Sequence, residues 1–250
     1  MYRVIGFVYG ANCYTAFLLV FLYLIAFLSG GLAPKGVDSG PSNSYLLGFA
    51  VDFALILLFG MQHSIMSRPW FKRVWTKIVP KPLERSTYVL ASSVSLGLLM
   101  WAWQPIPLSI WSLEGIWTPM LWSLAAFGWG LVLASTFAIN HFHLFGLQQV
   151  FEFLKKIQPR SPAYKESWMY KLVRHPLMLG FIIAFWATPD MSLGRLIFAG
   201  GMTFYILMAL QFEERDLLAE HGQTYANYRD RVPMLVPFTK HQHRSPEVSR

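Results

Sequence analysis

Long apolar stretches recur along the whole chain and limit what it can fold into. A helix needs about 20 mainly apolar residues to cross the hydrocarbon core of a bilayer. Apolar runs cover residues 4–28, 45–65, 88–103, 120–139 and 177–212. The chain is 54% hydrophobic and 14% charged, whereas an ordinary soluble domain carries about 25% charged residues. This composition excludes a disordered chain and predicts a multi-pass integral membrane protein, folded as an all-α helical bundle.

The last apolar run is long enough for two helices and is broken near its middle. The interruption around Pro189 and Arg195 predicts a C-terminal helical hairpin that follows four transmembrane spans. The first arm has only about 13 residues, or roughly 20 Å of helix, so it either tilts or stops short of the far side of the bilayer. We expect one membrane domain over residues 1–250, with the four spans in 1–140, the hairpin and its flanking cytosolic segments in 141–240, and a mobile tail in 241–250.

The basic residues lie in alternate connections between the apolar runs. The chain has 21 lysines and arginines and a formal net charge of +8. If both termini lie on one side, only Lys35 and Arg195 fall on the other, which leaves 19 of the 21 together. Because basic residues concentrate in cytosolic loops, we predict cytosolic termini and a basic face that contacts anionic lipid headgroups. A chain this apolar is not expected to bind nucleic acid.

The connection over residues 104–119 has no basic residue and is surrounded by tryptophans. We expect these side chains to form an aromatic belt at the outer membrane interface. They are Trp101, Trp103, Trp111, Trp117 and Trp122. Cys13 is the single cysteine of the chain, and this excludes an internal disulfide and a cysteine-based metal cluster.

Polar side chains gather at the predicted cytosolic ends of the runs. A hairpin returns its two ends to one face, so Arg174 and His175 are expected near Glu213 and Glu214, far apart as they are in the sequence. Simpler roles remain open for each. Arg174 could be a topology anchor, His175 could only precede the helix start at Pro176, and the glutamates could be a solvated helix end.

Three histidines lie on the same predicted side of the membrane. His63 is near the end of the second run, and His141 and His143 follow the fourth. His63 could equally be a buried, hydrogen-bonded side chain without a chemical role. His141 and His143 are two positions apart, so they point to nearly opposite faces of a helix and are poor joint ligands for one metal ion. We therefore predict neither a metal site nor a haem site.

Two segments of the C-terminal half form a pair of motifs. Arg174-His175-Pro176 precedes the hairpin, and Glu213-Glu214 with Gly222-x-x-Tyr225-x-x-Tyr228 follows it. In this order, the motifs resemble the membrane methyltransferase superfamily of isoprenylcysteine carboxyl methyltransferases and phospholipid N-methyltransferases. Segments 62–64, 68–72, 84–88 and 140–147 are similar to the nurim-type branch of that superfamily. Within this branch, the chain resembles the bacterial methanethiol S-methyltransferases.

The resemblance implies a site for S-adenosylmethionine (SAM) at the two ends of the hairpin. An arginine can bind both oxygens of the SAM carboxylate, a glutamate can bind its ammonium or ribose hydroxyls, and a tyrosine ring can face its adenine or sulfonium. The implied cofactor-binding residues are Tyr170, Arg174, His175, Pro176, Gly180, Glu213, Glu214, Tyr225 and Tyr228.

The resemblance also implies an enzyme of the bacterial inner membrane that methylates a small thiol, methanethiol to dimethyl sulfide, at a cytosolic active site. A thiol with a pKa of about 8.5 needs a base or a nearby cation to react at neutral pH. We predict His141 or His143 as that catalytic base, with His63 as the third candidate. Two alternatives stay open, namely a lipid or prenyl-type acceptor and a non-enzymatic nurim-like membrane protein.

Overall fold

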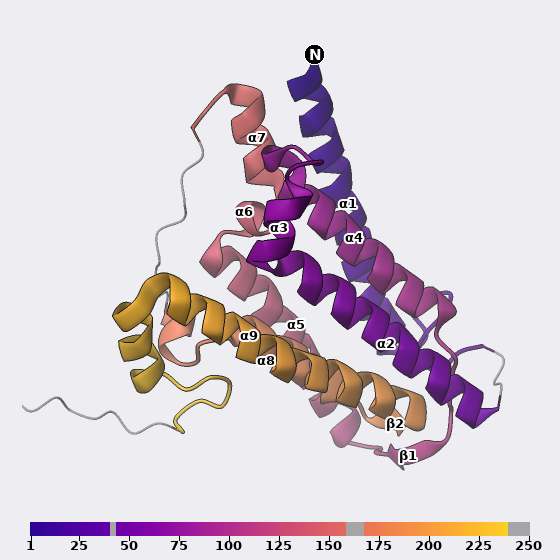
Figure 1. Ribbon diagram of the computed structural model, residues 1–250. Coiled ribbons are helices and arrows are strands. Elements are labelled where there is room, and N and C mark those ends of the chain that lie inside the picture. The colour runs from indigo at the N-terminus through magenta and orange to yellow at the C-terminus, as the bar shows by residue number, and fades with distance from the viewer. Residues whose placement is uncertain (41–43, 159–167, 240–250) are drawn as a thin grey trace, which may run out of the picture.

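The computed structural model describes residues 1–40, 44–158 and 168–239, and these residues are mostly helical (Figure 1). The helices are α1 (Tyr2–Ser29), α2 (Tyr45–Ser67), α3 (Pro69–Trp75), α4 (Lys81–Ala102), α5 (Trp117–Ile139), α6 (His141–Leu144), α7 (Leu147–Lys155), the 3₁₀ helix η1 (Trp168–Lys171), α8 (Pro176–Trp186) and α9 (Leu193–Arg231). The tail predicted to be mobile, residues 241–250, lies outside the described residues.

Four helices in the described part of the chain are long and apolar enough to cross a membrane. They are α1, α2, α5 and α9. The first three contain the first, second and fourth predicted spans, and α9 contains the second arm of the predicted hairpin. The protein is thus a mostly helical chain with several candidate membrane spans, as its apolar runs predict.

All but the last residue of the third predicted span, residues 88–103, lies in α4, which is not one of these four apolar helices. α4 packs against both α1 and α2. Its serines are bonded within the protein: Ser93 Oγ donates to Val89 O at 2.8 Å, and Ser95 Oγ donates to Gln62 Oε1 at 2.8 Å. Because these hydroxyl groups are hydrogen-bonded inside the protein, a helix that is covered by neighbouring helices can contain them. The fourth helix that is long and apolar enough to cross a membrane is therefore α9 and not α4.

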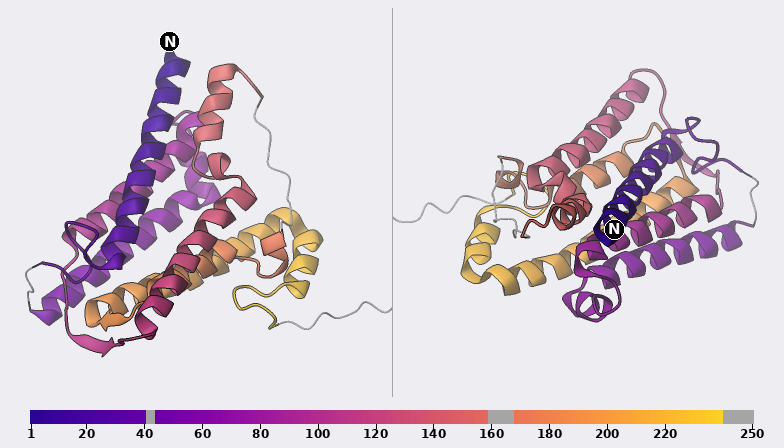
Figure 2. Two further views of the ribbon diagram at one scale, coloured as in Figure 1. Left: turned by 180° about the vertical axis from the view of Figure 1, so that it is seen from behind. Right: turned by 90° about the horizontal axis from the view of Figure 1, so that it is seen from above.

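The all-α prediction missed a small antiparallel sheet. Strand β1 (Ser109–Ser112) pairs with β2 (Asp190–Ser192), and Trp111 lies opposite Met191. The sheet joins the connection before α5 to the connection before α9 at one end of the molecule (Figure 1). The N-terminus, α6 and α7 lie toward the other end (Figure 2). Strands of four and three residues are too short to show an alternating pattern in the sequence.

A buried arginine ties α1 and α9 together at the sheet end. Arg195 Nε lies 2.6 Å from Asp38 Oδ2, and Arg195 Nη1 donates to Leu28 O at 2.7 Å. Ser192 Oγ donates to the same aspartate. The Arg195 side chain is only 9% exposed. Arg195 therefore forms an internal ion pair with Asp38 and is not one of the surface charges that set topology.

The largest apolar core lies where α1, α4, α8 and α9 meet. Trp103, directly after α4, is fully buried, and its ring centroid lies 6.3 Å from that of Phe27 and 5.6 Å from that of Phe198. Such edge-to-face contacts favour a dense core. The prediction that Trp103 belongs to the interfacial belt is therefore wrong, whereas Trp101 and Trp117, at 75% and 53% exposure, remain on the surface.

Helices α5 and α8 pack with their backbones in contact. A side-chain carbon at Gly128 would lie 2.7 Å from Ala184 N and 2.8 Å from Gly180 O, closer than any real carbon lies. Residues without side chains permit this approach. α8 has 11 residues, about 16 Å of helix, so it is shorter than the hydrocarbon core, as its short apolar run predicts.

Replacing Gly128 with valine is expected to force α5 and α8 apart and to lower the free energy of unfolding by about 1–3 kcal/mol or more. Gly130→Val is the matched control, because a side-chain carbon at Gly130 on the same helix meets no atom within 4 Å. Thermal unfolding of both variants in detergent, followed by circular dichroism, measures the difference. Equal melting temperatures would contradict the close crossing.

Candidate active site

The two predicted motifs meet at a buried ion pair. Arg174, just before α8, donates from Nε to Glu214 Oε1 at 2.7 Å and from Nη2 to Glu214 Oε2 at 2.9 Å. The two side chains are only 6% and 12% exposed. Two parallel charge-assisted bonds fix both the distance and the orientation of such a pair. The start of α8 is therefore held against the middle of α9.

The remaining donors of Arg174 hold the end of the chain. Its Nη1 donates to Arg229 O at 2.8 Å and to Val232 O at 2.7 Å, and its backbone N donates to Pro233 O at 2.9 Å. An arginine side chain has five N–H groups, and these contacts with those to Glu214 use four of them. A bidentate bond to a ligand carboxylate needs two neighbouring free N–H groups. The geometry therefore assigns Arg174 to holding the site together, and it does not support the predicted contact with a SAM carboxylate.

Glu214 accepts two further hydrogen bonds. His175 Nε2 lies 2.9 Å from Glu214 Oε1, and Tyr225 OH donates to the same oxygen at 3.0 Å. A carboxylate can only accept, so Nε2 of His175 carries the proton of this hydrogen bond. Three predicted site residues thus share one glutamate, and their side chains are fixed relative to one another.

A bend in α9 brings its last turns back to this glutamate. Gly222 has φ 54° and ψ −129°, a conformation that glycine adopts readily and other residues rarely do. Beyond the bend, Tyr228 OH donates to Tyr170 O at 2.6 Å. Tyr225 and Tyr228 are 2% and 3% exposed, so their rings are packed inside the protein and not open for stacking on adenine.

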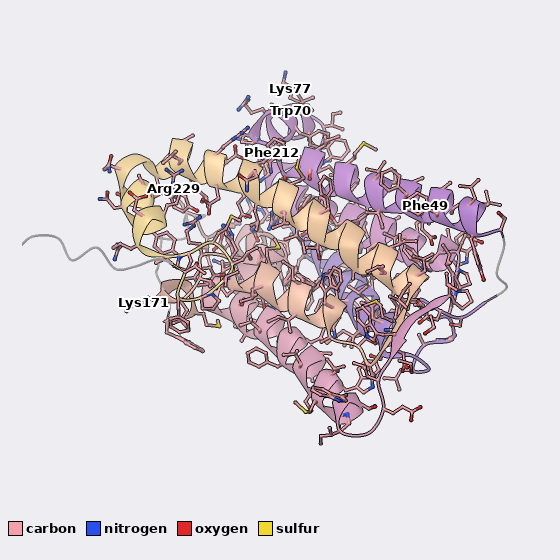
Figure 3. The ribbon with its side chains drawn as sticks, turned by 90° about the horizontal axis from the view of Figure 1, so that it is seen from below. Phe49, Trp70, Lys77, Lys171, Phe212 and Arg229 are labelled. Carbon is pink, nitrogen blue, oxygen red and sulfur yellow. The ribbon has the colours of Figure 1, made fainter. Side chains whose placement is uncertain are left out.

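The cluster lies where η1, the start of α8 and the last part of α9 meet. In Figure 3, Lys171 of η1 and Arg229 of α9 are on the same side of the molecule, and Phe49 of α2 lies toward the opposite side. This places the cluster far from the sheet, at an end formed by segments that are distant in the sequence.

Glu213 differs from its neighbour because it is open. Its side chain is 47% exposed, and its Oε2 lies 4.0 Å from His175 Nδ1. Burial raises the pKa of Tyr170, and the negative charge of Glu213 raises it further, which puts the carboxylate close to this ring. Within the described residues, no lysine or arginine pairs with Glu213. Glu213 is therefore an acidic group that a ligand can reach.

His63 is engaged through both ring nitrogens. Its Nδ1 lies 2.9 Å from Ser92 Oγ and its Nε2 lies 2.8 Å from Tyr88 OH, both on α4. A ring held in this way joins α2 to α4 and leaves no nitrogen for a substrate.

His141 is engaged in the same manner between two other helices. Its Nε2 lies 2.7 Å from Tyr14 OH on α1, and its Nδ1 lies 2.8 Å from Thr136 Oγ1 on α5. As with His63, these two hydrogen bonds account for the burial of the ring.

His143 on α6 keeps a free imidazole. Its backbone contacts Asn140 and Gln149, but the ring has no hydrogen-bond partner among the described residues. Burial lowers the pKa of His143, and the charge of Arg85 lowers it further against an opposing effect of Glu152. A neutral imidazole with free nitrogens can accept a proton. Of the three predicted bases, His143 fits that role best.

Two predicted residues lie at packing positions. Pro176 is the first residue of α8, where its lack of an N–H has no cost. Gly180 faces α5 at the helix crossing and not the polar cluster. A cofactor contact by either residue stays a prediction.

One residue near His143 was not predicted. Arg85 belongs to segment 84–88, which carries part of the nurim-type resemblance, but no role was assigned to it. Its position near His143 depends on the packing of α6 on α4, which residue spacing does not reveal.

The chain matches the NnrU protein family over residues 53–238. The chain belongs to the NnrU family. The matched range contains every predicted site residue. Family membership therefore covers the polar cluster and the histidines together, rather than the membrane helices alone.

Two bacterial relatives match nearly the full length of the chain. A protein of Pseudomonas sp. (strain GM41(2012)) named methanethiol S-methyltransferase is 49% identical over 94% of this chain and 91% of its own. A Mycobacterium tuberculosis protein of the same name is 46% identical over 97% of this chain and 100% of its own. Human nurim is 29% identical over 70% of each chain. The resemblance predicted from the motifs is thus confirmed. No solved structure matches the chain significantly.

The two adjacent glutamates should differ sharply in their effect on stability. Glu214→Gln leaves the buried Arg174 charge without a carboxylate and is expected to lower the free energy of unfolding by about 3–5 kcal/mol. Glu213→Gln, on a half-exposed side chain, is expected to change it by less than about 0.5 kcal/mol. Thermal unfolding of the two variants in detergent provides the comparison. A Glu214→Gln protein as stable as Glu213→Gln would show that the pair does not hold the site.

Proposed function

We propose that the protein is a membrane methyltransferase that uses SAM to methylate a small thiol, converting methanethiol to dimethyl sulfide. The observation that carries this proposal is identity of 44–49% with several proteins named methanethiol S-methyltransferase, across most of the length of both chains. The polar cluster between η1, α8 and α9 supplies the chemical groups that such a site needs.

We further propose that this cluster and both termini face the cytosol of a bacterial inner membrane, with α8 and the apolar part of α9 forming a hairpin. The distribution of basic residues supports the orientation. The packing of α8 on α9 and the ion pair of Arg174 with Glu214 support the hairpin. A cytosolic site would have direct access to a cytosolic methyl donor.

Methyl transfer by in-line displacement requires the acceptor atom and the methyl carbon to be about 3 Å apart, aligned and shielded from water. When bound, SAM would supply that methyl group on a sulfonium centre. The residues present fit its ammonium group. Glu213 Oε2 and His175 Nδ1 lie 4.0 Å apart, and an ammonium, which has three N–H donors, would donate to both when Nδ1 carries no proton.

The rest of the cluster would hold these two acceptors in place. Arg174, Glu214 and Tyr225 are bonded to one another and fix the ring of His175. Tyr170 borders the carboxylate of Glu213. In this proposal Glu213 and His175 contact the cofactor, and the buried residues behind them are positioning residues.

The acceptor thiol needs to lose its proton before it attacks. His143 would take that proton, because burial and Arg85 keep its ring neutral. The similarity to nurim would also suit a membrane protein without enzymatic activity. An assay of methyl transfer distinguishes an enzyme from such a protein.

Purified protein in detergent or vesicles is expected to release dimethyl sulfide from methanethiol when SAM is present, measured in the headspace by gas chromatography. Glu213→Gln should weaken SAM binding about 10-fold or more, because it removes the charged partner of the ammonium. Gln223→Ala, on an exposed position of α9, is the control. SAM binding without any methylated thiol would contradict the acceptor assignment. Absence of both would favour the non-enzymatic alternative.

The rate should depend on pH through His143. Because the pKa of His143 is lowered, the neutral, proton-accepting ring persists below its ordinary value, and the acid fall in kcat/KM should lie below about pH 6.5. His143→Gln should lower kcat/KM about 100-fold at pH 7 and less at pH 9, where more of the thiol is already ionised. His141→Gln should keep the wild-type pH profile. If His141→Gln changed the pH profile and His143→Gln kept that of the wild type, His141 would be the base.

A further inference from the structure

Arg85 is a charged side chain whose bonding capacity is largely unused. It lies in the first turns of α4 and is half-buried. Its Nε donates to Leu144 O at 2.7 Å, and its guanidinium carbon lies 5.0 Å from the centroid of the Tyr88 ring. Both Nη atoms lack an acceptor among the described residues. Four N–H donors of this arginine therefore point to no protein group in that part of the chain.

Three other arginines of the bundle are paired with carboxylates. Arg174 binds Glu214, Arg195 binds Asp38, and Arg68 Nη1 lies 2.9 Å from Asp216 Oδ2. Arg85 has no such partner in the described residues, although Glu84 precedes it in the sequence. A half-buried cation without a counter-charge is costly, and it offers a binding partner to an anionic ligand group.

The segment that carries His143 is fixed to this arginine. Leu144, whose carbonyl accepts from Arg85 Nε, is the residue after His143. Two residues further on, Gly146 has φ 86° and lies so close to Ser86 that a side-chain carbon there would be 2.7 Å from Ser86 N. Ser86 Oγ donates to Gly146 O at 3.3 Å. The cation and the free imidazole are thus positioned by one set of contacts between α4 and α6.

The charges around His143 come from two elements. Arg85 on α4 lowers the pKa of its ring, and Glu152 on α7 opposes this with a smaller effect. Glu152 is buried and accepts from Gln148 Nε2 at 2.7 Å. The net result of burial and charge is a neutral base beside an uncompensated positive charge.

We propose that Arg85 binds the sulfur of the acceptor thiol as its thiolate, and that His143 receives the thiol proton. This assignment rests on the proposed function. The S–H proton moves to a ring nitrogen of His143, and the sulfur lone pair forms a bond to the methyl carbon of the donor. The bond between that carbon and the donor sulfonium breaks, leaving two neutral thioethers, and the proton later passes from His143 to water.

The chemistry of the two groups favours a thiolate over a hard anion. A guanidinium is weakly hydrated and suits a large, polarisable sulfur, and a cation within about 4–6 Å lowers the pKa of an acid by 1–3 units. A neighbouring base is needed only if the ligand arrives protonated, as a thiol does and a carboxylate does not.

The test compares kcat/KM for methanethiol from pH 6 to pH 10 in the wild-type protein, Arg85→Gln and Arg85→Lys, together with SAM binding by calorimetry. The glutamine variant keeps a donor for Leu144 O but loses the charge, so it should lose about 10- to 100-fold in kcat/KM at pH 7 and recover most of this at pH 10. Its SAM affinity should stay within about twofold, and the lysine variant should recover part of the rate at pH 7. Arg73→Met, an exposed arginine on α3, should match the wild type.

A more acidic acceptor sharpens the result. A small selenol is already ionised at neutral pH, so Arg85→Gln should lose less activity with the selenol than with methanethiol. Equal losses for both acceptors at every pH, with weaker SAM binding, would assign Arg85 to the SAM carboxylate and overturn the proposal. An Arg85→Gln protein as active as the wild type would overturn it as well. A wild-type protein that forms no dimethyl sulfide would instead refute the proposed function and this assignment with it.

Discussion

The bidentate bond between Arg174 and Glu214 is the interaction on which the polar end of the molecule depends. It joins the start of α8 to the middle of α9, and the same guanidinium binds carbonyls of residues 229 and 232. A buried charge needs a complete set of partners, so these segments are stable together and not separately. The ring of His175 and the open carboxylate of Glu213 take their positions from this bond.

The order of the motifs along the chain allowed the meeting of Arg174 with Glu214 to be predicted, because a turn between two helices returns their ends to one place. Which partners each side chain would choose could not be predicted. Arg174 is nearly saturated by the protein, and Tyr225 and Tyr228 are packed inside. Bonds to backbone carbonyls leave no trace in a sequence, since every residue has one.

The hydrogen-bond partners of the three histidines could not be predicted from the sequence either. His63 and His143 have similar surroundings in the sequence, at the ends of apolar runs. Hydroxyls on a neighbouring helix occupy both nitrogens of His63, whereas His143 stays free. Trp103 was misjudged for a related reason: a tryptophan that fills a core looks like a membrane-facing one until the packing is known.

The bend at Gly222 has a consequence for the order in which the protein is built. The carbonyls that surround Arg174 and the hydroxyl of Tyr225 come from beyond this bend, near the end of the chain. Helices α1, α2, α5 and α8 and the part of α9 before the bend all precede them. During synthesis the helices can therefore enter the membrane before the polar cluster exists, and the cluster closes only when the ribosome has released the last turns of α9.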